Sequence, residues 1–107
     1  MAEDFYCDEV LSGKTPVERV FETENVLAYH HTRPFWETHI VVIPKTHVDS
    51  LLTVETDLLN ELLDVVKTVA ALVVGEKGAA RVLTNLGEYQ DSKHLHFHVN
   101  SGAQIRK

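Results

Sequence analysis

The C-terminal part of the chain contains the segment His94-Leu95-His96-Phe97-His98-Val99, in which imidazole and apolar side chains alternate strictly. A period of two residues predicts a β-strand with one buried apolar face and one water-exposed, reactive face. Successive side chains on one face of a strand lie roughly 6.5 to 7 Å apart, so neighbouring imidazoles can bind one phosphate-sized group together. We therefore expect the function of the protein to depend on this row of histidines.

Spacing alone leaves three interpretations of the histidine face open. A neutral imidazole is a nucleophile near pH 7, which suits phosphate or acyl transfer. Histidines at alternate positions also suit a metal site, and a histidine-rich surface can respond to pH. The residues around the histidines are needed to choose between these three interpretations.

Composition limits the class of protein. A chain of 107 residues with 44% hydrophobic content predicts one domain, spanning 1–107, with a single modest core. The 16 acidic and 10 basic residues give a formal charge of -6 without a Lys/Arg cluster, so polymeric nucleic acid is not expected as a partner. No apolar run reaches the roughly 20 residues of a membrane span, so we expect no membrane partner.

The cysteine content and the N-terminal residues indicate the cellular location. Cys7 is the single cysteine, which excludes an internal disulfide. The N-terminal residues are acidic and lack the basic and then apolar build of a signal peptide. We therefore expect the protein to be cytoplasmic.

Hydrophobic patterns predict an α+β fold, with a mainly antiparallel sheet of about five strands, one long helix and one short N-terminal helix. Two short strands around Glu24-Asn25 are typical of a hairpin, and a β-branched run before Pro44 indicates a central strand beside the histidines. The predicted strands are 19–23, 26–30, 38–43, 80–84 and 94–99, and the short helix is 5–12.

The long helix is predicted from about Thr56 to Lys77, because apolar residues recur there at steps of three and four. Thr53 or Thr56 is expected to cap its N-terminus. Gly75 and Gly78 are expected to end it. Its role is structural, packing on the sheet.

Two blocks of this sequence resemble the histidine triad (HIT) family. The triad itself matches the family signature His-φ-His-φ-His-φ-φ, except that Asn100 stands at the last apolar position. The segment from Pro34 to His47 is similar to the family's Pro-x-x-x-x-His-φ-φ-φ-Ile-Pro-Lys-x-His block. The resemblance extends from about Tyr6 to Gly102 and is nearest to the small nucleoside phosphoramidases called Hint proteins.

The resemblance implies a HIT-like fold and a hydrolase that acts at the α-phosphate of a nucleoside monophosphate derivative, such as an AMP derivative, without a cofactor. His96 would attack phosphorus and carry a transient nucleotidyl adduct, which water would then hydrolyse. His98 would donate an N–H to a phosphate oxygen. The backbone carbonyl of His94 would accept the other ring N–H of His96 and so fix the attacking nitrogen. No metal is required.

Supporting residues also follow from the resemblance. By residue type alone, His39 is more often a core histidine, Asn85 a turn residue and Gln90 a solvated loop residue, whereas the resemblance makes all three candidates for the site. Flat apolar rings suit a purine, although the same side chains are equally typical of a core. The residues implied to bind substrate are Asn85, Gln90, Tyr29, His31, Val41 and Tyr6.

Several positions depart from the family pattern. His31 stands where an aspartate usually binds the ribose hydroxyls, which puts ribose recognition in question. Glu88 and Tyr89 replace glycines in a shortened loop, and Asp91 stands where serine or threonine is common. Carboxylates beside the phosphate would disfavour a polyphosphate leaving group and favour a neutral or cationic amine.

Some family members bind zinc through two N-terminal cysteines, a histidine matching His47 and the first triad histidine. This chain offers only Cys7, with Asp4 as an unusual substitute, so we expect no metal and a structural role for His47. A homodimer joined edge to edge through its sheets is implied by the resemblance. A dinucleoside polyphosphate hydrolase, a nucleotide-binding interaction protein with little turnover and a metal-binding protein remain as alternatives.

Overall fold

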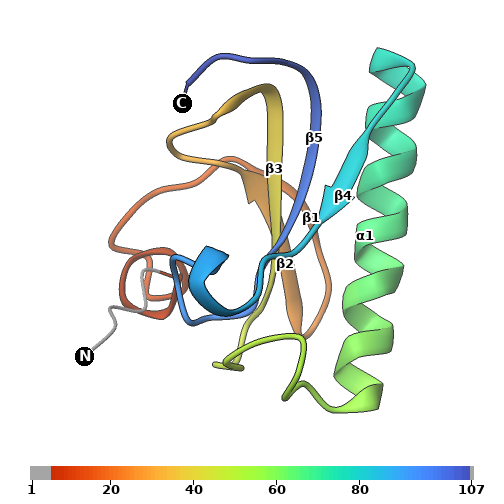
Figure 1. The fold of residues 1–107 in the computed structure, drawn as a ribbon. Helices are drawn as coiled ribbons and strands as arrows, with labels where there is room; N and C mark the ends of the chain where they lie inside the picture. The colour runs from red at the N-terminus through yellow and green to blue at the C-terminus, as the bar shows by residue number, and fades with distance from the viewer. Residues whose placement is uncertain (1–5, 107) are drawn as a thin grey trace.

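The computed structural model describes residues 6–106 and is built on a five-stranded antiparallel sheet (Figure 1). The order across the sheet is β1-β2-β3-β5-β4, and every neighbouring pair is antiparallel. The α+β class and the five-stranded sheet are thereby confirmed. The strands are β1 (Arg19–Glu22), β2 (Val26–His30), β3 (Trp36–Pro44), β4 (Arg81–Leu83) and β5 (Phe97–Gln104).

Helix α1 (Thr56–Lys77) covers one face of the sheet and has the predicted bounds. Its N-terminus differs from the prediction. Glu55 is the N-cap and makes no side-chain capping bond, and the hydroxyl of the predicted cap Thr53 donates to the carbonyl of Ser50. Gly78 ends the helix with a φ of 84°, a left-handed conformation that glycine adopts without strain. Gly75 lies inside the helix and does not end it.

The main core lies between α1 and this face of the sheet. Apolar side chains of α1 repeat at helical spacing and meet alternate residues of the central strands. The buried members are Leu62, Val65, Val66, Val69 and Val73 of the helix, with Val26, Ala28, Ile40, Val42, Leu95, Phe97 and Val99 opposite.

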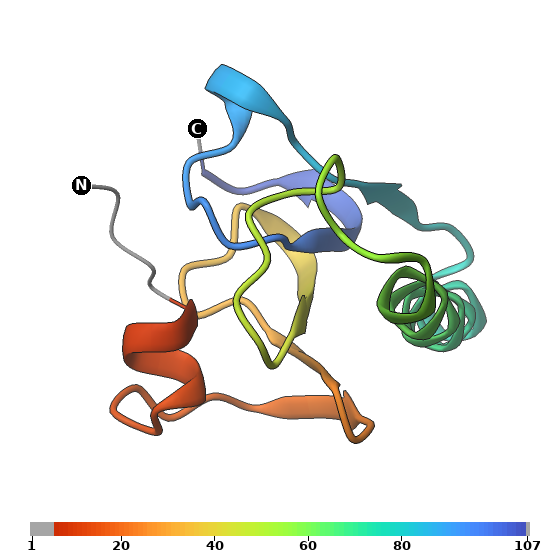
Figure 2. The ribbon, with the colours of Figure 1, turned by 90° about the horizontal axis from the view of Figure 1, so that it is seen from below.

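The opposite face of the sheet is covered in part by η1 (Tyr6–Leu11), a π-helical segment, so that the sheet lies between η1 and α1 (Figure 2). A short helix was expected over 5–12; residue 5 lies outside the described residues, and the rest forms a π-helical turn. A second, smaller cluster is buried here, consisting of Tyr6, Val10, Leu27, Tyr29, Val41 and Ile43.

The histidine segment begins its strand later than predicted. β5 starts at Phe97, because the Leu95 N–H donates to the Val48 carbonyl at 2.7 Å, and the His96 carbonyl accepts the Thr84 hydroxyl at 2.7 Å. These backbone groups are therefore satisfied by a loop and a side chain instead of a strand ladder.

The predicted alternation is nevertheless present, since the apolar residues between the histidines join the α1 core. The histidine face is not water-exposed as predicted. His94 is fully buried, and His96 is only 6% exposed, because Tyr6 of η1 packs 5.5 and 5.0 Å from their ring centroids. Water is thus excluded from most of the imidazole row.

Among residues 6–106, no helix is long and apolar enough to cross a membrane. The loop after β4 contains one short 3₁₀ turn, η2 (Gly87–Tyr89), before the chain returns to the histidines.

Candidate active site

His96 is held by the backbone of its own segment. Its Nδ1 lies 2.8 Å from the carbonyl oxygen of His94, and because a carbonyl can only accept, Nδ1 carries the hydrogen. Nε2 of the neutral ring therefore carries the lone pair. The Thr84 hydroxyl fixes the His96 backbone, and the His94 Nε2–H donates to the Pro44 carbonyl at 3.0 Å. The ring of His94 thus ties the segment to the end of β3.

A second hydrogen-bonded chain orients His98. The backbone N–H of Phe35 donates to His39 Nδ1 at 3.1 Å, so the neutral His39 ring carries its hydrogen on Nε2. His39 Nε2 lies 2.9 Å from His98 Nδ1 and donates to it. The remaining nitrogen of His98, Nε2, is therefore an N–H donor. One backbone amide sets the tautomers of two imidazoles through this relay, which we call the Phe35–His39–His98 relay.

His39, His98 and His96 are held neutral by their surroundings. Burial, reinforced by His31 and His96, lowers the pKa of His39 to about 4. Burial, reinforced by His96, His39 and His31, lowers the pKa of His98 to about 3. Burial also lowers the pKa of His96, against the opposing effects of the His94 carbonyl bond and of Asp91. At neutral pH, His96 therefore presents a lone pair on Nε2, and His98 presents an N–H on Nε2.

Two adjoining cavities open beside this row. The larger, of about 410 Å³, reaches His96 and His98; the smaller, of about 270 Å³, reaches Tyr29 and Thr32. Tyr6, His31 and Arg33 line both cavities. The other residues of the larger cavity are Phe35, Asn85, Tyr89, Asp91, Ser92 and Arg106.

The structure brings some of the residues implied for substrate binding to these cavities and not others. Tyr6, Tyr29, His31 and Asn85 line them. Gln90 does not; it is buried, and its side-chain amide donates to the Asp49 carbonyl at 2.7 Å. Val41 is fully buried and lines neither cavity.

The basic residues of the larger cavity, Arg33 and Arg106, were not predicted from the sequence. They are far apart in the chain, and each lies in an irregular segment without a recognisable pattern. In the structure both line the same cavity, where the Arg106 guanidinium lies 5.7 Å from the centroid of the Phe35 ring. Asp91 is the acidic residue of this cavity, whereas Glu88 does not line it.

The unusual Asn100 of the signature has a structural explanation. It is 1% exposed, and its side-chain oxygen accepts a bond of 3.0 Å from Arg81 Nη1. Arg81 also lies over the Trp36 ring at 4.5 Å. A polar residue is tolerated at this buried position because its acceptor is paired.

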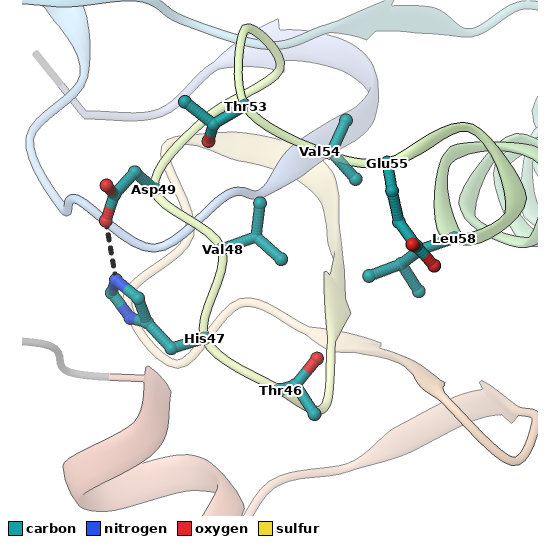
Figure 3. A pocket seen from close by; sticks show the side chains of 8 residues that line it. All are labelled: Thr46, His47, Val48, Asp49, Thr53, Val54, Glu55 and Leu58. Carbon is teal, nitrogen blue, oxygen red and sulfur yellow. Dashed lines mark hydrogen bonds and ion pairs between the residues drawn. The ribbon is translucent and has the colours of Figure 1, made fainter.

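A separate cavity of about 420 Å³ lies between the loop after β3 and the start of α1, and contains no triad side chain (Figure 3). His47 Nε2 lies 2.7 Å from Asp49 Oδ1 there, and the His47 ring packs edge-on to His94 at 5.3 Å. Asp4 and the side chain of Cys7 lie outside the described part. Within the part that is described, no group of three or more His, Cys, Asp or Glu residues is arranged to hold a metal.

A sheet that carries three alternating, mutually oriented imidazoles beside a cleft is the architecture of a histidine triad protein. The family model "HIT domain" matches residues 12–105, and the chain belongs to the HIT family.

Individual relatives agree with this assignment. A 13.2 kDa HIT-like protein of Azospirillum brasilense is 37% identical over 103 residues, covering 90% of this chain and 84% of the relative. The adenosine 5'-monophosphoramidase HNT1 of Candida albicans is 28% identical over 106 residues, covering 92% and 69%. The solved structure of a hypothetical histidine triad nucleotide-binding protein from Sulfolobus tokodaii has a TM-score of 0.83 and 31% identity, covering 91% of this chain and 67% of that one.

Proposed function

We propose that the protein is a Hint-like nucleotide hydrolase that cleaves the P–N or P–O bond at the α-phosphate of a nucleoside monophosphate derivative. The observation that carries this proposal is the 2.8 Å bond from His96 Nδ1–H to the His94 carbonyl. It directs the lone pair to Nε2, in a side chain that lines the cleft. A neutral imidazole that is fixed in this way is a prepared nucleophile.

The reaction proceeds in two displacements. His96 Nε2 forms a bond to phosphorus as the bond to the leaving group breaks, and the leaving nitrogen or oxygen takes up a proton from solvent. Water then attacks the nucleotidyl-histidine adduct, which releases the nucleoside monophosphate and returns His96 to the neutral form. His98 Nε2–H donates to a non-bridging oxygen while negative charge builds up on it.

The side chains that line the cleft and the activity of one relative indicate the substrate class. Because the imidazoles are neutral, Arg33 and Arg106 supply the positive charge beside the phosphate, against one carboxylate, Asp91. The smaller cavity presents the rings of Tyr6 and Tyr29, which suit a purine face. The phosphoramidase activity named for the Candida relative agrees with an AMP derivative as substrate. Asn85 lies on the side of the cleft that binds the phosphate. Gln90 acts indirectly, because its bond to the Asp49 carbonyl holds the loop before Asp91.

A homodimer in the cytoplasm is part of the proposal. β4 is an edge strand of the sheet in the described chain, and it exposes Val82 and Leu83. Helix α1 exposes Leu63 and Val74. A second copy that pairs at this edge would cover apolar surface of both elements. Equilibrium sedimentation at micromolar concentration is expected to give the dimer mass, and a monomer there would contradict this part.

The deciding experiment is AMP release from adenosine 5'-phosphoramidate, with EDTA present, by the wild type and by His96→Ala. We expect turnover by the wild type and a loss of at least about 10³-fold in kcat/KM for the variant. His30→Ala is the matched control, because His30 is exposed at the end of β2. Equal rates for wild type and His96→Ala would refute the proposed nucleophile, and faster cleavage of a diadenosine polyphosphate would assign a different leaving group.

A further inference from the structure

The residues shared by the two cavities lie where a sugar would sit. If the proposed function is right, the phosphorus lies at His96 in the larger cavity and the purine lies at Tyr29 in the smaller one. The ribose that joins them must then pass the residues that line both cavities. Those residues are Tyr6, His31 and Arg33. The chemistry of His31 and Arg33 therefore decides which sugar is accepted.

His31 presents a hydrogen-bond donor at this junction. The backbone N–H of Arg33 donates to His31 Nδ1 at 3.0 Å, so the neutral ring carries its hydrogen on Nε2. Burial, reinforced by His96 and by the positive charges of Arg106 and Arg33, lowers the pKa of His31 and favours its neutral form. Stacking on His39, at 4.5 Å between centroids and 29° between planes, fixes the ring.

A donor at this position can bind a ribose hydroxyl through its oxygen, but it leaves the hydroxyl hydrogens without an acceptor. The two hydroxyl hydrogens are best bound by a carboxylate, which accepts both of them. Among the residues that line the smaller cavity there is no Asp or Glu. An imidazole N–H binds most strongly to an acceptor oxygen that carries negative charge.

The charge at the junction agrees with such a group. Arg33 lines both cavities, and Arg106 lines the larger one. Both are close enough to His31 to act on its titration. Within residues 6–106, neither guanidinium forms an ion pair with a carboxylate. Two guanidinium groups beside a directed N–H form a common phosphate-binding arrangement.

We propose that the site selects nucleotides that carry a second phosphate on the ribose, at the 2′ or the 3′ hydroxyl. His31 Nε2–H and the Arg33 guanidinium bind this second phosphate, while His96 and His98 face the 5′ phosphorus. His31 and Arg33 are thus specificity-determining residues of the proposed hydrolase.

Calorimetric titration of the wild type with AMP, adenosine 2′,5′-bisphosphate and adenosine 3′,5′-bisphosphate tests the proposal. We expect one bisphosphate to bind at least about 10-fold more tightly than AMP, and the two isomers identify the position. Arg33→Gln is expected to reduce this advantage to less than about threefold. His31→Asp is expected to reverse it in favour of AMP, because a carboxylate repels the second phosphate and accepts the ribose hydroxyls. Arg19→Gln is the control, since Arg19 is an exposed cation on β1 that pairs with Glu22.

AMP binding as tightly as both bisphosphates would overturn the inference, as would an advantage that survives both Arg33→Gln and His31→Asp. Turnover of adenosine 5'-phosphoramidate, measured on the same preparation, separates this failure from that of the proposed function. Turnover without a bisphosphate preference refutes the second phosphate site alone. A bisphosphate preference without any His96-dependent turnover supports the second phosphate site and refutes the proposed hydrolase.

Discussion

Lowering the pH from about 7.5 to about 5.5 is expected to destabilise the folded protein through its buried imidazoles. An unfolded histidine titrates near 6.5, whereas burial lowers the pKa of His39 to about 4 and that of His98 to about 3. Between these values the unfolded chain binds more protons than the folded chain. Stability is therefore full above the unfolded pKa and is lost progressively as the pH falls toward the folded values.

The size of the effect follows from the same values. One unit below its unfolded pKa, each histidine that stays neutral in the folded state favours unfolding by about 1.4 kcal/mol. His39 is buried and contributes nearly all of this. His98 is partly exposed, so its share is reduced by solvent screening. We expect a total loss of about 2 kcal/mol from these two side chains.

Urea unfolding, followed at both pH values, measures the free energies that are compared. His39→Gln removes one of the titrating groups and should make the pH-dependent loss smaller by about 1 kcal/mol. His30→Gln is the matched control, since His30 is an exposed histidine outside the Phe35–His39–His98 relay, and the wild-type loss should persist in it. Equal free energies of unfolding for the wild type at the two pH values would refute the reasoning.

Three further predictions concern leaving-group choice, positioning and the core. The preference for a cationic over a neutral amine leaving group is measured as a ratio of kcat/KM values. Asp91→Asn should reduce this ratio by about 3-fold to 10-fold. An unchanged ratio would show that Asp91 does not act on the leaving group. Thr84→Val removes the bond to the His96 carbonyl and should lower kcat about 10-fold with little change in KM, and Thr84→Ser should restore it. Leu62→Ala empties a fully buried position of α1 and should lower the free energy of unfolding by about 2 to 5 kcal/mol in urea titration, whereas the exposed Leu52→Ala should cost far less.

The long elements of the fold were predictable because α1 keeps a helical apolar repeat and the central strand is a β-branched run. The stripe of α1 repeats over several turns, and the strand 26–30 is followed by a run that ends at a proline. The helix cap was not predictable, because Thr53 can bond either to α1 or to the turn before it, and it bonds to Ser50. The start of β5 was predicted too early, because the Leu95 N–H donates to the Val48 carbonyl. These two residues come together only in the folded chain.

The geometry of the histidine row could be predicted because its members are neighbours in the sequence. Alternation placed His94, His96 and His98 on one face, and the bond between His94 and His96 spans only two residues. Burial of this face was missed, because Tyr6 comes from a segment whose position depends on the folded sheet. The shared position of Arg33 and Arg106 in one cavity was missed for the same reason, since they lie in segments more than seventy residues apart.

In the proposed mechanism, catalysis and charge recognition are divided between different side chains of this site. A histidine row with its pKa values lowered by burial supplies lone pairs and N–H groups but no net charge near pH 7. Attraction of an anionic substrate must then come from Arg33 and Arg106, which line the same cavity. Replacing either arginine is therefore expected to weaken substrate binding and its dependence on salt, while leaving the lone pair of His96 in place. In the proposed mechanism, Asp91 adjusts leaving-group choice without protonating His96, because its carboxylate raises the pKa of His96 only against the larger effect of burial.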